Sequence, residues 1–94
     1  MISRDRDIFR VSGPVTIDNV RVVIEEGRRE FAGNDARVDL GGLENVDSSA
    51  LSMLLEWMRD AAANGRQFRV LNVPENLTSL ARVYGVLDHL PIEA

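Results

Sequence analysis

Short strand-like runs alternate with stretches of helical periodicity along the whole chain, and this alternation limits the folds open to it. Apolar residues recur at i, i+3, i+4, i+7 and i+11 in two stretches that begin at Val20 and Leu51, and a shorter stripe begins at Leu77. This spacing places apolar side chains on one face of a helix. Residues 36–40 and 67–73, between the stripes, have strand composition. Such alternation predicts an α/β domain with a parallel or mixed sheet and right-handed crossovers.

The beginning of the chain is predicted to add two short strands. Residues 8–12 alternate apolar and polar side chains, and residues 15–17 form a second β-like run after the Gly13-Pro14 break. Arg and Asp alternate within residues 1–7, and we expect this segment to be frayed. At the other end, the apolar residues within 86–92 are consistent with an edge strand or with an irregular return.

Capping residues and helix breakers set the expected ends of the helices. Asp18 is the predicted N-cap of the first helix, and Pro74 is the predicted first position of the third. The Gly41-Gly42 pair is expected to interrupt the central strand. The helices are expected to end at Gly33-Asn34-Asp35, at Asn64-Gly65 and at Gly85.

These elements are expected to form one domain, residues 1–94. The predicted sheet is small and mixed or parallel, with about four to five strands. Three helices are expected mainly on one side, because a chain of 94 residues has too few helices to cover both faces.

The composition excludes several classes of function. The chain contains no cysteine, which removes disulfides and thiolate chemistry, and its single histidine, His89, cannot form a multi-histidine metal site. All 11 basic residues are arginine, so the chain has neither a P-loop lysine nor a Schiff-base lysine. The net charge of −4 argues against general affinity for nucleic acid. We therefore expect no metal, no cofactor and no independent enzymatic activity.

Apolar runs are only a few residues long, far short of the roughly 20 that span a bilayer. The first residues also lack the apolar core of a secretory signal. The sequence therefore predicts a cytoplasmic domain without direct membrane insertion.

The turn Asp47-Ser48-Ser49 precedes the longest predicted helix and consists entirely of N-cap residue types. A helix N-terminus offers unpaired N–H groups and a positive dipole end. The two hydroxyls could accept those hydrogen bonds, or they could carry a phosphate that the dipole favours. Capping alone is sufficient to explain the turn in isolation.

The predicted outward face of the same helix points to a partner-binding role. Ser49, Ala50, Ser52 and Met53 are small or adaptable and carry no charge over nearly two turns, whereas a solvated face normally carries charged residues. Small residues allow another surface to approach closely. Trp57 lies off the main apolar stripe and is equally consistent with this patch and with the edge of the core.

The stretch VDLGGLENVDSSALSMLLEWM resembles the STAS domain, typified by the bacterial anti-sigma factor antagonists. The strand QFRVLNV and the segment NLTSLARVYGVLDHLP also fall where STAS counterparts would. A closing run of leucine, alanine, valine and tyrosine is similar to that of the MlaB-type STAS proteins: Leu80, Ala81, Val83, Tyr84 and Val86. The resemblance implies the anti-sigma factor antagonist-like fold.

The resemblance to the MlaB type also implies a role. Such proteins are non-catalytic, cytoplasmic subunits of an ABC transporter that moves phospholipid and maintains outer-membrane lipid asymmetry. They bind the MlaF-like ATPase, which is in complex with a membrane permease, and so lie peripherally at the inner membrane through that partner. By this resemblance Ser48 lies at the ATPase contact. The expected partner-binding residues are Asp47, Ser48, Ser49, Ala50, Ser52 and Met53.

The alternative implied by the same resemblance is an anti-sigma factor antagonist that an anti-sigma kinase switches by phosphorylating Ser49, the second hydroxyl of the turn. Two departures from the family pattern concern this surface. Ala50 stands where glycine is common, and Thr16 stands where the antagonists commonly have an aspartate, which weakens the sigma-regulator interpretation. A small enzyme is the third alternative, but His89 is its only candidate neutral base and is expected at the surface.

Overall fold

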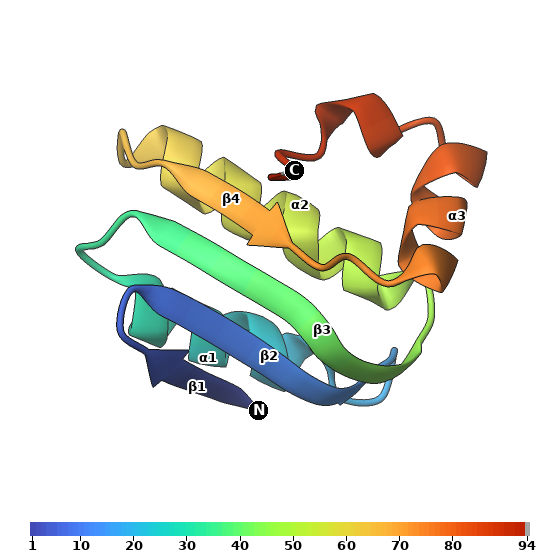
Figure 1. Ribbon diagram of the computed structural model, residues 1–94, viewed down its shortest axis with the longest axis horizontal. Coiled ribbons are helices and arrows are strands. Elements are labelled where there is room, and N and C mark those ends of the chain that lie inside the picture. Colours follow the sequence, from blue (N-terminus) through green and yellow to red (C-terminus); the bar gives the residue numbers. More distant parts are fainter. Residues whose placement is uncertain (94) are drawn as a thin grey trace.

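The computed structural model describes residues 1–93 and contains one four-stranded sheet with three α-helices. The elements are β1 (Ile2–Asp5), β2 (Ile8–Val15), α1 (Val20–Phe31), β3 (Ala36–Val46), α2 (Ser49–Ala63), β4 (Phe68–Leu71), α3 (Glu75–Val83) and the 3₁₀ turn η1 (Leu87–His89). The strand order is β1-β2-β3-β4, with β1 antiparallel to β2 and the other neighbours parallel (Figure 1). The α/β class and the mixed sheet are confirmed.

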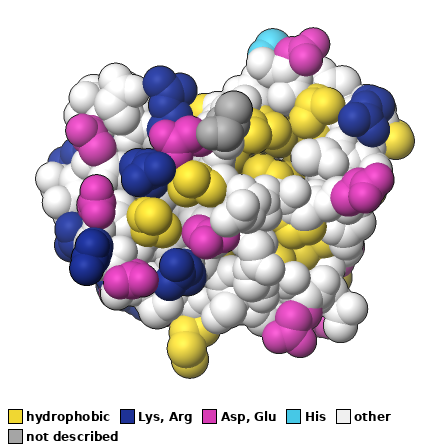
Figure 2. All heavy atoms as spheres, in the orientation of Figure 1, with side chains coloured by type: hydrophobic (Ala, Val, Ile, Leu, Met, Phe, Trp, Pro, Cys, Tyr) yellow, Lys and Arg dark blue, Asp and Glu magenta, His cyan; other side chains and the backbone are white. Residues whose placement is uncertain are grey.

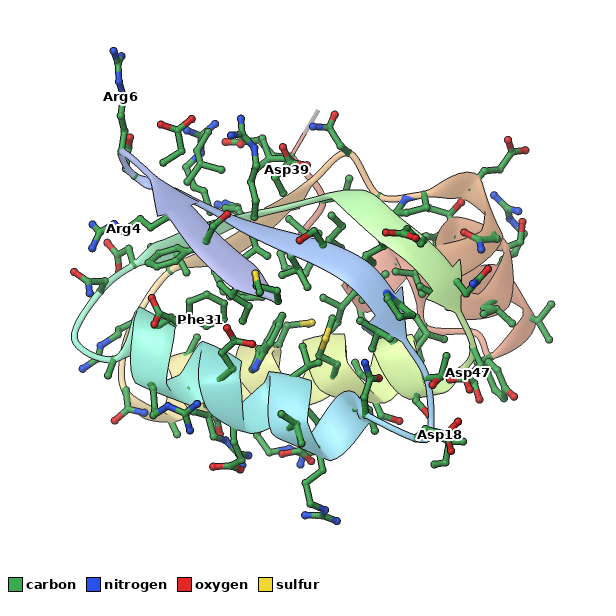
Figure 3. All side chains as sticks on the ribbon, turned by 90° about the horizontal axis from the view of Figure 1, so that it is seen from below. Arg4, Arg6, Asp18, Phe31, Asp39 and Asp47 are labelled. Carbon is green, nitrogen blue, oxygen red and sulfur yellow. The ribbon has the colours of Figure 1, made fainter. Side chains whose placement is uncertain are left out.

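Helices α1 and α2 cover one face of the sheet, as Figure 3 shows, and α3 lies at one end beside α2 (Figure 1). Successive side chains along each strand therefore point alternately toward the helices and toward the opposite face of the sheet. Phe9, Val38 and Val70 are buried beneath the helices. The opposite face carries charged side chains of both signs (Figure 2), including the pairs Arg10–Asp39 at 3.4 Å and Arg37–Glu93 at 2.7 Å.

The first residues form a strand, so the expectation of a frayed segment is wrong. Strand β1 is anchored by Ile2, whose side chain is 8% exposed and which lies opposite Val11. The backbone groups of Met1 exchange hydrogen bonds with those of Ser12 at 2.8 and 2.9 Å, and the N–H of Ile2 donates to Glu26 at 3.1 Å. One buried isoleucine and backbone pairing suffice to order this polar segment.

Two predicted strand breaks do not occur. Strand β2 continues through Gly13-Pro14 to Val15, and the run at 15–17 is not a strand of its own. Gly13 has φ of +88°, and the register of β2 against β3 shifts on either side of it. The strand therefore continues through Gly13-Pro14 with irregular pairing and does not end there. Strand β3 likewise continues across Gly41-Gly42, where the carboxylate of Asp39 accepts a hydrogen bond from the N–H of Gly41 at 2.8 Å.

The N-terminal ends of two helices differ by one residue from the predictions. The N-cap of α1 is Asn19 rather than Asp18, and its side chain bonds to the preceding turn, accepting from the N–H of Thr16 at 2.9 Å. Pro74 is the N-cap of α3 rather than its first residue. The predicted C-terminal ends of all three helices are confirmed. Residues 86–92 form the irregular return, with η1 and a single parallel bridge from Ile92 to Val70.

Trp57 belongs to the core, with 2% of its surface exposed. Its indole N–H donates to the carbonyl of Ile24 at 3.1 Å. The ring lies directly against Gly27 of α1, where any Cβ would collide with it. This contact allows α1 and α2 to approach closely over the sheet. Within residues 1–93, no helix has both the length and the apolarity that crossing a membrane requires.

Candidate partner-binding surface

The turn between β3 and α2 is held by the carboxylate of Asp47. One oxygen accepts the N–H of Ser49 at 2.8 Å, and the other accepts the N–H of Ile17, in the loop before α1, at 3.1 Å. These backbone hydrogen bonds lower the pKa of Asp47, because they stabilise the ionised form. Asp47 therefore caps α2 and ties a second loop to it, at the end of the molecule where α1 begins (Figure 3).

The two serines of the turn have different environments. Ser48 is the N-cap residue by position, but its side chain makes no capping bond, and it is exposed. Ser49 is only 8% exposed. The capping predicted for the turn as a whole is therefore performed by Asp47, and Ser48 presents its hydroxyl to solvent.

Ala50 and Met53 are fully buried and Ser49 is buried as well, so the expectation that these three lie on an outward face of α2 is wrong, and of that predicted set only Ser52 is exposed. The buried face of α2 is centred on Ala50, Met53, Leu54 and Trp57, whereas Leu55 is only partly buried. The helical spacing fits two overlapping stripes. Packing against the sheet and against α1 buries the stripe that contains Ala50, Met53 and Trp57. The predicted stripe, which begins at Leu51, faces partly toward α3.

Two grooves flank the exposed side chain of Ser52. The α2–α3 groove has a volume of about 350 Å³ and is lined by Ser48, Leu51, Ser52, Leu55, Tyr84 and Val86. The α1–α2 groove has a volume of about 420 Å³ and is lined by Ile17, Val20, Arg21, Ile24, Glu25, Arg28, Ser49, Ser52 and Glu56. Because Ser52 lines both, it forms a small, uncharged ridge between them.

An exposed apolar side chain lies along each groove. Ile17 is 75% exposed in the α1–α2 groove, and Tyr84 is 60% exposed in the α2–α3 groove. We call the ridge of Ser48 and Ser52, the two grooves and these two side chains the docking surface. Sequence reasoning missed Ile17 and Tyr84 as members, because they come together with the serines only through the packing of α1 and α3 on α2.

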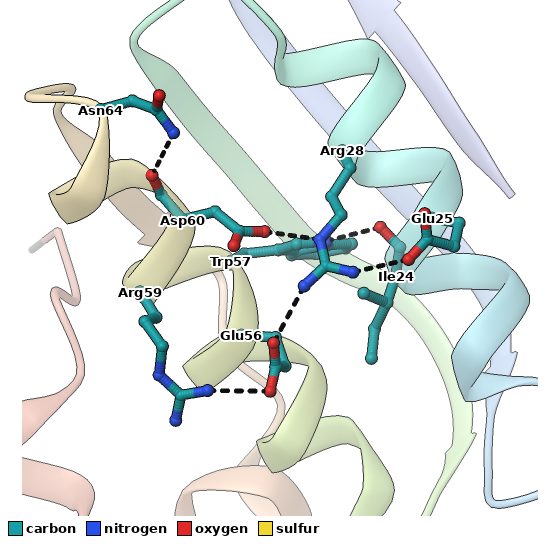
Figure 4. A network of polar contacts seen from close by, with 8 residues as sticks. All are labelled: Ile24, Glu25, Arg28, Glu56, Trp57, Arg59, Asp60 and Asn64. Atoms are coloured by element: carbon teal, nitrogen blue, oxygen red, sulfur yellow. Dashed lines mark hydrogen bonds and ion pairs between the residues drawn. The ribbon is translucent and has the colours of Figure 1, made fainter.

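A charge network forms part of the wall of the α1–α2 groove and is neutralised internally (Figure 4). Arg28 of α1 contacts Glu25 on its own helix, and it reaches Glu56 at 2.9 Å and Asp60 at 2.7 Å on α2. Hydrogen bonding to Asp60 and Glu25 raises the pKa of Arg28 further above its already high value. The network joins the two helices and leaves the serine ridge uncharged.

The described residues give no support to a metal centre. No group of three or more His, Asp or Glu side chains among residues 1–93 is arranged to hold a metal ion. His89 is exposed in η1. Every buried side-chain nitrogen or oxygen in this part of the chain has a hydrogen-bond partner.

A family model described as the MlaB STAS domain matches residues 2–92. A search among curated proteins found no match. Similar solved structures are those of a candidate anti-sigma factor antagonist from Thermotoga maritima and of the anti-sigma factor antagonist SpoIIAA in its unphosphorylated form. The first has a TM-score of 0.79 at 15% identity and covers 98% of this chain and 83% of that one. The second has a TM-score of 0.74 at 15% identity and covers 100% and 87%.

A serine-to-glutamate variant of RsbS from Moorella thermoacetica is also similar, with a TM-score of 0.68 at 21% identity and coverage of 99% and 84%. At these identities the three structures establish the SpoIIAA-like STAS fold alone.

Proposed function

Because the chain belongs to the MlaB-type STAS domain family, we propose that it is a non-catalytic subunit that binds and supports the ATPase of a phospholipid-transporting ABC complex. In this proposal the partner is an MlaF-like ATPase in complex with its membrane permease, and the protein lies at the cytoplasmic side of the inner membrane through that contact. The observation that carries the proposal is the uncharged Ser48–Ser52 ridge between two grooves.

The shape of the docking surface suits a protein partner that places one apolar side chain in each groove. Ser48 and Ser52 are small, so the partner backbone can come close to the start of α2. No charge on the ridge has to lose its hydration, and burial of an unpaired charge is costly at an interface. Ile17 and Tyr84 add exposed apolar area on either side, as expected for contacts that carry binding energy.

The walls of this surface are held in place before any partner arrives. The carboxylate of Asp47 fixes the start of α2 and the loop that carries Ile17, through its bonds to Ser49 and Ile17. A preorganised surface loses less conformational entropy on binding. Asp47 is therefore a positioning residue in the proposed contact.

The burial of Ser49 bears on the alternative function, an antagonist switched by phosphorylation at that residue. Ser49 is 8% exposed, and its N–H is bonded to the carboxylate of Asp47. A phosphate there would add about −1.5 to −2 charge units beside an existing negative charge. Ser49 is reached only from the α1–α2 groove that it lines, and little of its surface is exposed there. This weighs in favour of the docking role.

The decisive experiment is a pull-down of the tagged protein from its native cells, with mass spectrometry of the partners and of the bait. The parent protein should recover an ABC ATPase together with its permease. Ser52→Arg should reduce that recovery by about tenfold or more, because a long charged side chain fills the ridge between the grooves. Ser79→Arg is the matched control, since Ser79 is exposed on α3 and lines neither groove.

Equal recovery of the ATPase by the parent and by Ser52→Arg would contradict docking at this surface. Recovery of a protein kinase in place of the transporter, with phosphate on Ser49, would replace the proposal by the antagonist alternative.

A further inference from the structure

A third pocket lies at the other end of α2, away from the docking surface. It has a volume of about 390 Å³ and is formed where α1 and α2 end and where β3 and β4 begin. On α2 it is lined by Trp57, Asp60 and Ala61, whereas the α1–α2 groove is lined by Ser49, Ser52 and Glu56 of that helix, and Arg28 of α1 lines both. We call it the aromatic pocket, and the lining residues that matter here are Phe31, Trp57, Ala61, Arg66 and Phe68.

The wall of the pocket is a cluster of three rings in fixed positions. The ring of Phe31 lies edge-on to that of Trp57, with centroids 4.9 Å apart, and 6.2 Å from that of Phe68. The ring of Trp57 is held by its bond to the carbonyl of Ile24 and by its seat against Gly27. Trp57 and Phe68 are 2% and 8% exposed and Phe31 is half-buried, so a further ring would meet chiefly Phe31, in the edge-to-face or offset geometry that aromatic pairs prefer.

The space in front of these rings is bounded partly by alanines and partly by polar side chains. Ala32, Ala36 and Ala61 all line the pocket, and each leaves room that a larger side chain would fill. A volume of about 390 Å³ is near the lower end of the range for small-molecule sites. The pocket therefore suits a ligand of one or two rings.

The charged groups of the pocket differ in their availability. Arg28 is engaged by three carboxylates, and Asp60 is one of them. Arg66 is half-buried at the pocket and forms no ion pair with any residue in the described range 1–93. A guanidinium beside aromatic rings offers a planar pair of donors that matches a carboxylate.

We propose that the aromatic pocket binds a small aromatic carboxylate, with its ring system against Phe31, Trp57 and Phe68 and its carboxylate on Arg66. This site is distinct from the proposed contact with the ATPase, although Arg28 lines both the aromatic pocket and the α1–α2 groove.

The test is a titration of the isotope-labelled protein followed by nuclear magnetic resonance. Trp57 is the only tryptophan and lines the pocket, so its indole N–H gives one resolved signal that reports on the ring. 2-Naphthoate should shift this signal saturably, with a Kd of about 1 mM or lower. 2-Naphthamide, which has the same rings and no charge, should bind about tenfold more weakly.

Two variants assign the contacts. Arg66→Gln should reduce naphthoate affinity by about tenfold and leave naphthamide affinity unchanged, with Arg69→Gln on the open face of the sheet as the control. Ala61→Leu should abolish binding by filling the pocket, whereas Ala63→Leu, exposed on the same helix, should not.

Three results would overturn the proposal. These are the absence of a saturable shift at Trp57 with 2-naphthoate, equal affinity for the acid and the amide, and undiminished binding by Arg66→Gln. The result for Arg66→Gln can be interpreted even if Ala61→Leu does not fold.

Discussion

The two ends of α2 are rigid for different reasons. At its start, one carboxylate bonds to two backbone N–H groups, and the serine side chains that remain exposed are uncharged. At its end, packed rings and the salt-bridge network of Arg28 hold α1 against α2. The first end presents the uncharged serine ridge, which we propose binds a protein. The second end has the aromatic pocket, which we propose binds a small molecule. The two ends of α2 are fixed by separate contacts, and each end is the place of one of the two proposed interactions.

A charged substitution in the core beneath the middle of α2 should unfold both ends of the helix together. Leu54 is fully buried in the middle of α2. Leu54→Asp buries an unpaired charge and should cost about 4 kcal/mol or more, comparable to the total stability of a small domain. We expect an unfolded protein by circular dichroism. Ser52→Asp, on the exposed side of the same helix, should melt as the parent does, and a folded Leu54→Asp protein would contradict the assigned helix face.

A larger side chain at Gly27 should disturb the contact between α1 and Trp57, which lies beside the aromatic pocket. A Cβ at this position would collide with the ring of Trp57, so Gly27→Ala should push α1 from α2 and destabilise the protein by about 1–3 kcal/mol. Thermal melting should show a lower Tm, and the fluorescence of Trp57 should change. Arg29→Ala on the exposed face of α1 is the control. An unchanged Tm would mean that the helices are not held together by this contact.

The sequence predicted the alternation of helices and strands from α1 onward and the chemical character of the turn at Asp47, because both depend on local patterns, but it missed β1. It failed where the outcome depends on packing. The apolar spacing of α2 fits two overlapping stripes, and only contact with the sheet and α1 decides that Ala50 and Met53 are buried. Ile2 orders a polar segment that has no apolar pattern of its own.

The candidate site shows the same division. Ser52 was predicted on the outward face from its residue type and is exposed, and so is Ser48, which the family resemblance implied, whereas Ser49 is buried. Ile17 and Tyr84 could not be found in that way, since the grooves they line are created by helices that are far apart in the sequence. The aromatic pocket also has no local signal, because its rings come from α1, α2 and β4.

The smallest expected effect concerns the start of α2 alone. The folded-state pKa of Asp47 lies below its ordinary value, so its ionised form stabilises the fold above that value and the contribution is lost as the pH falls through the folded pKa. Asp47→Asn weakens both backbone contacts and should lower the Tm by a few degrees at pH 7. The difference from the parent should narrow as the pH falls below about 4, where the carboxyl of the unfolded chain takes up a proton, and it should disappear once the pH has passed the lower pKa of the folded protein. Asp18→Asn is the matched control, because Asp18 is exposed and its carboxylate accepts no hydrogen bond within residues 1–93. A difference that persists unchanged at low pH would show that the amide disturbs the turn by its shape and that the charge of Asp47 does not hold the start of α2.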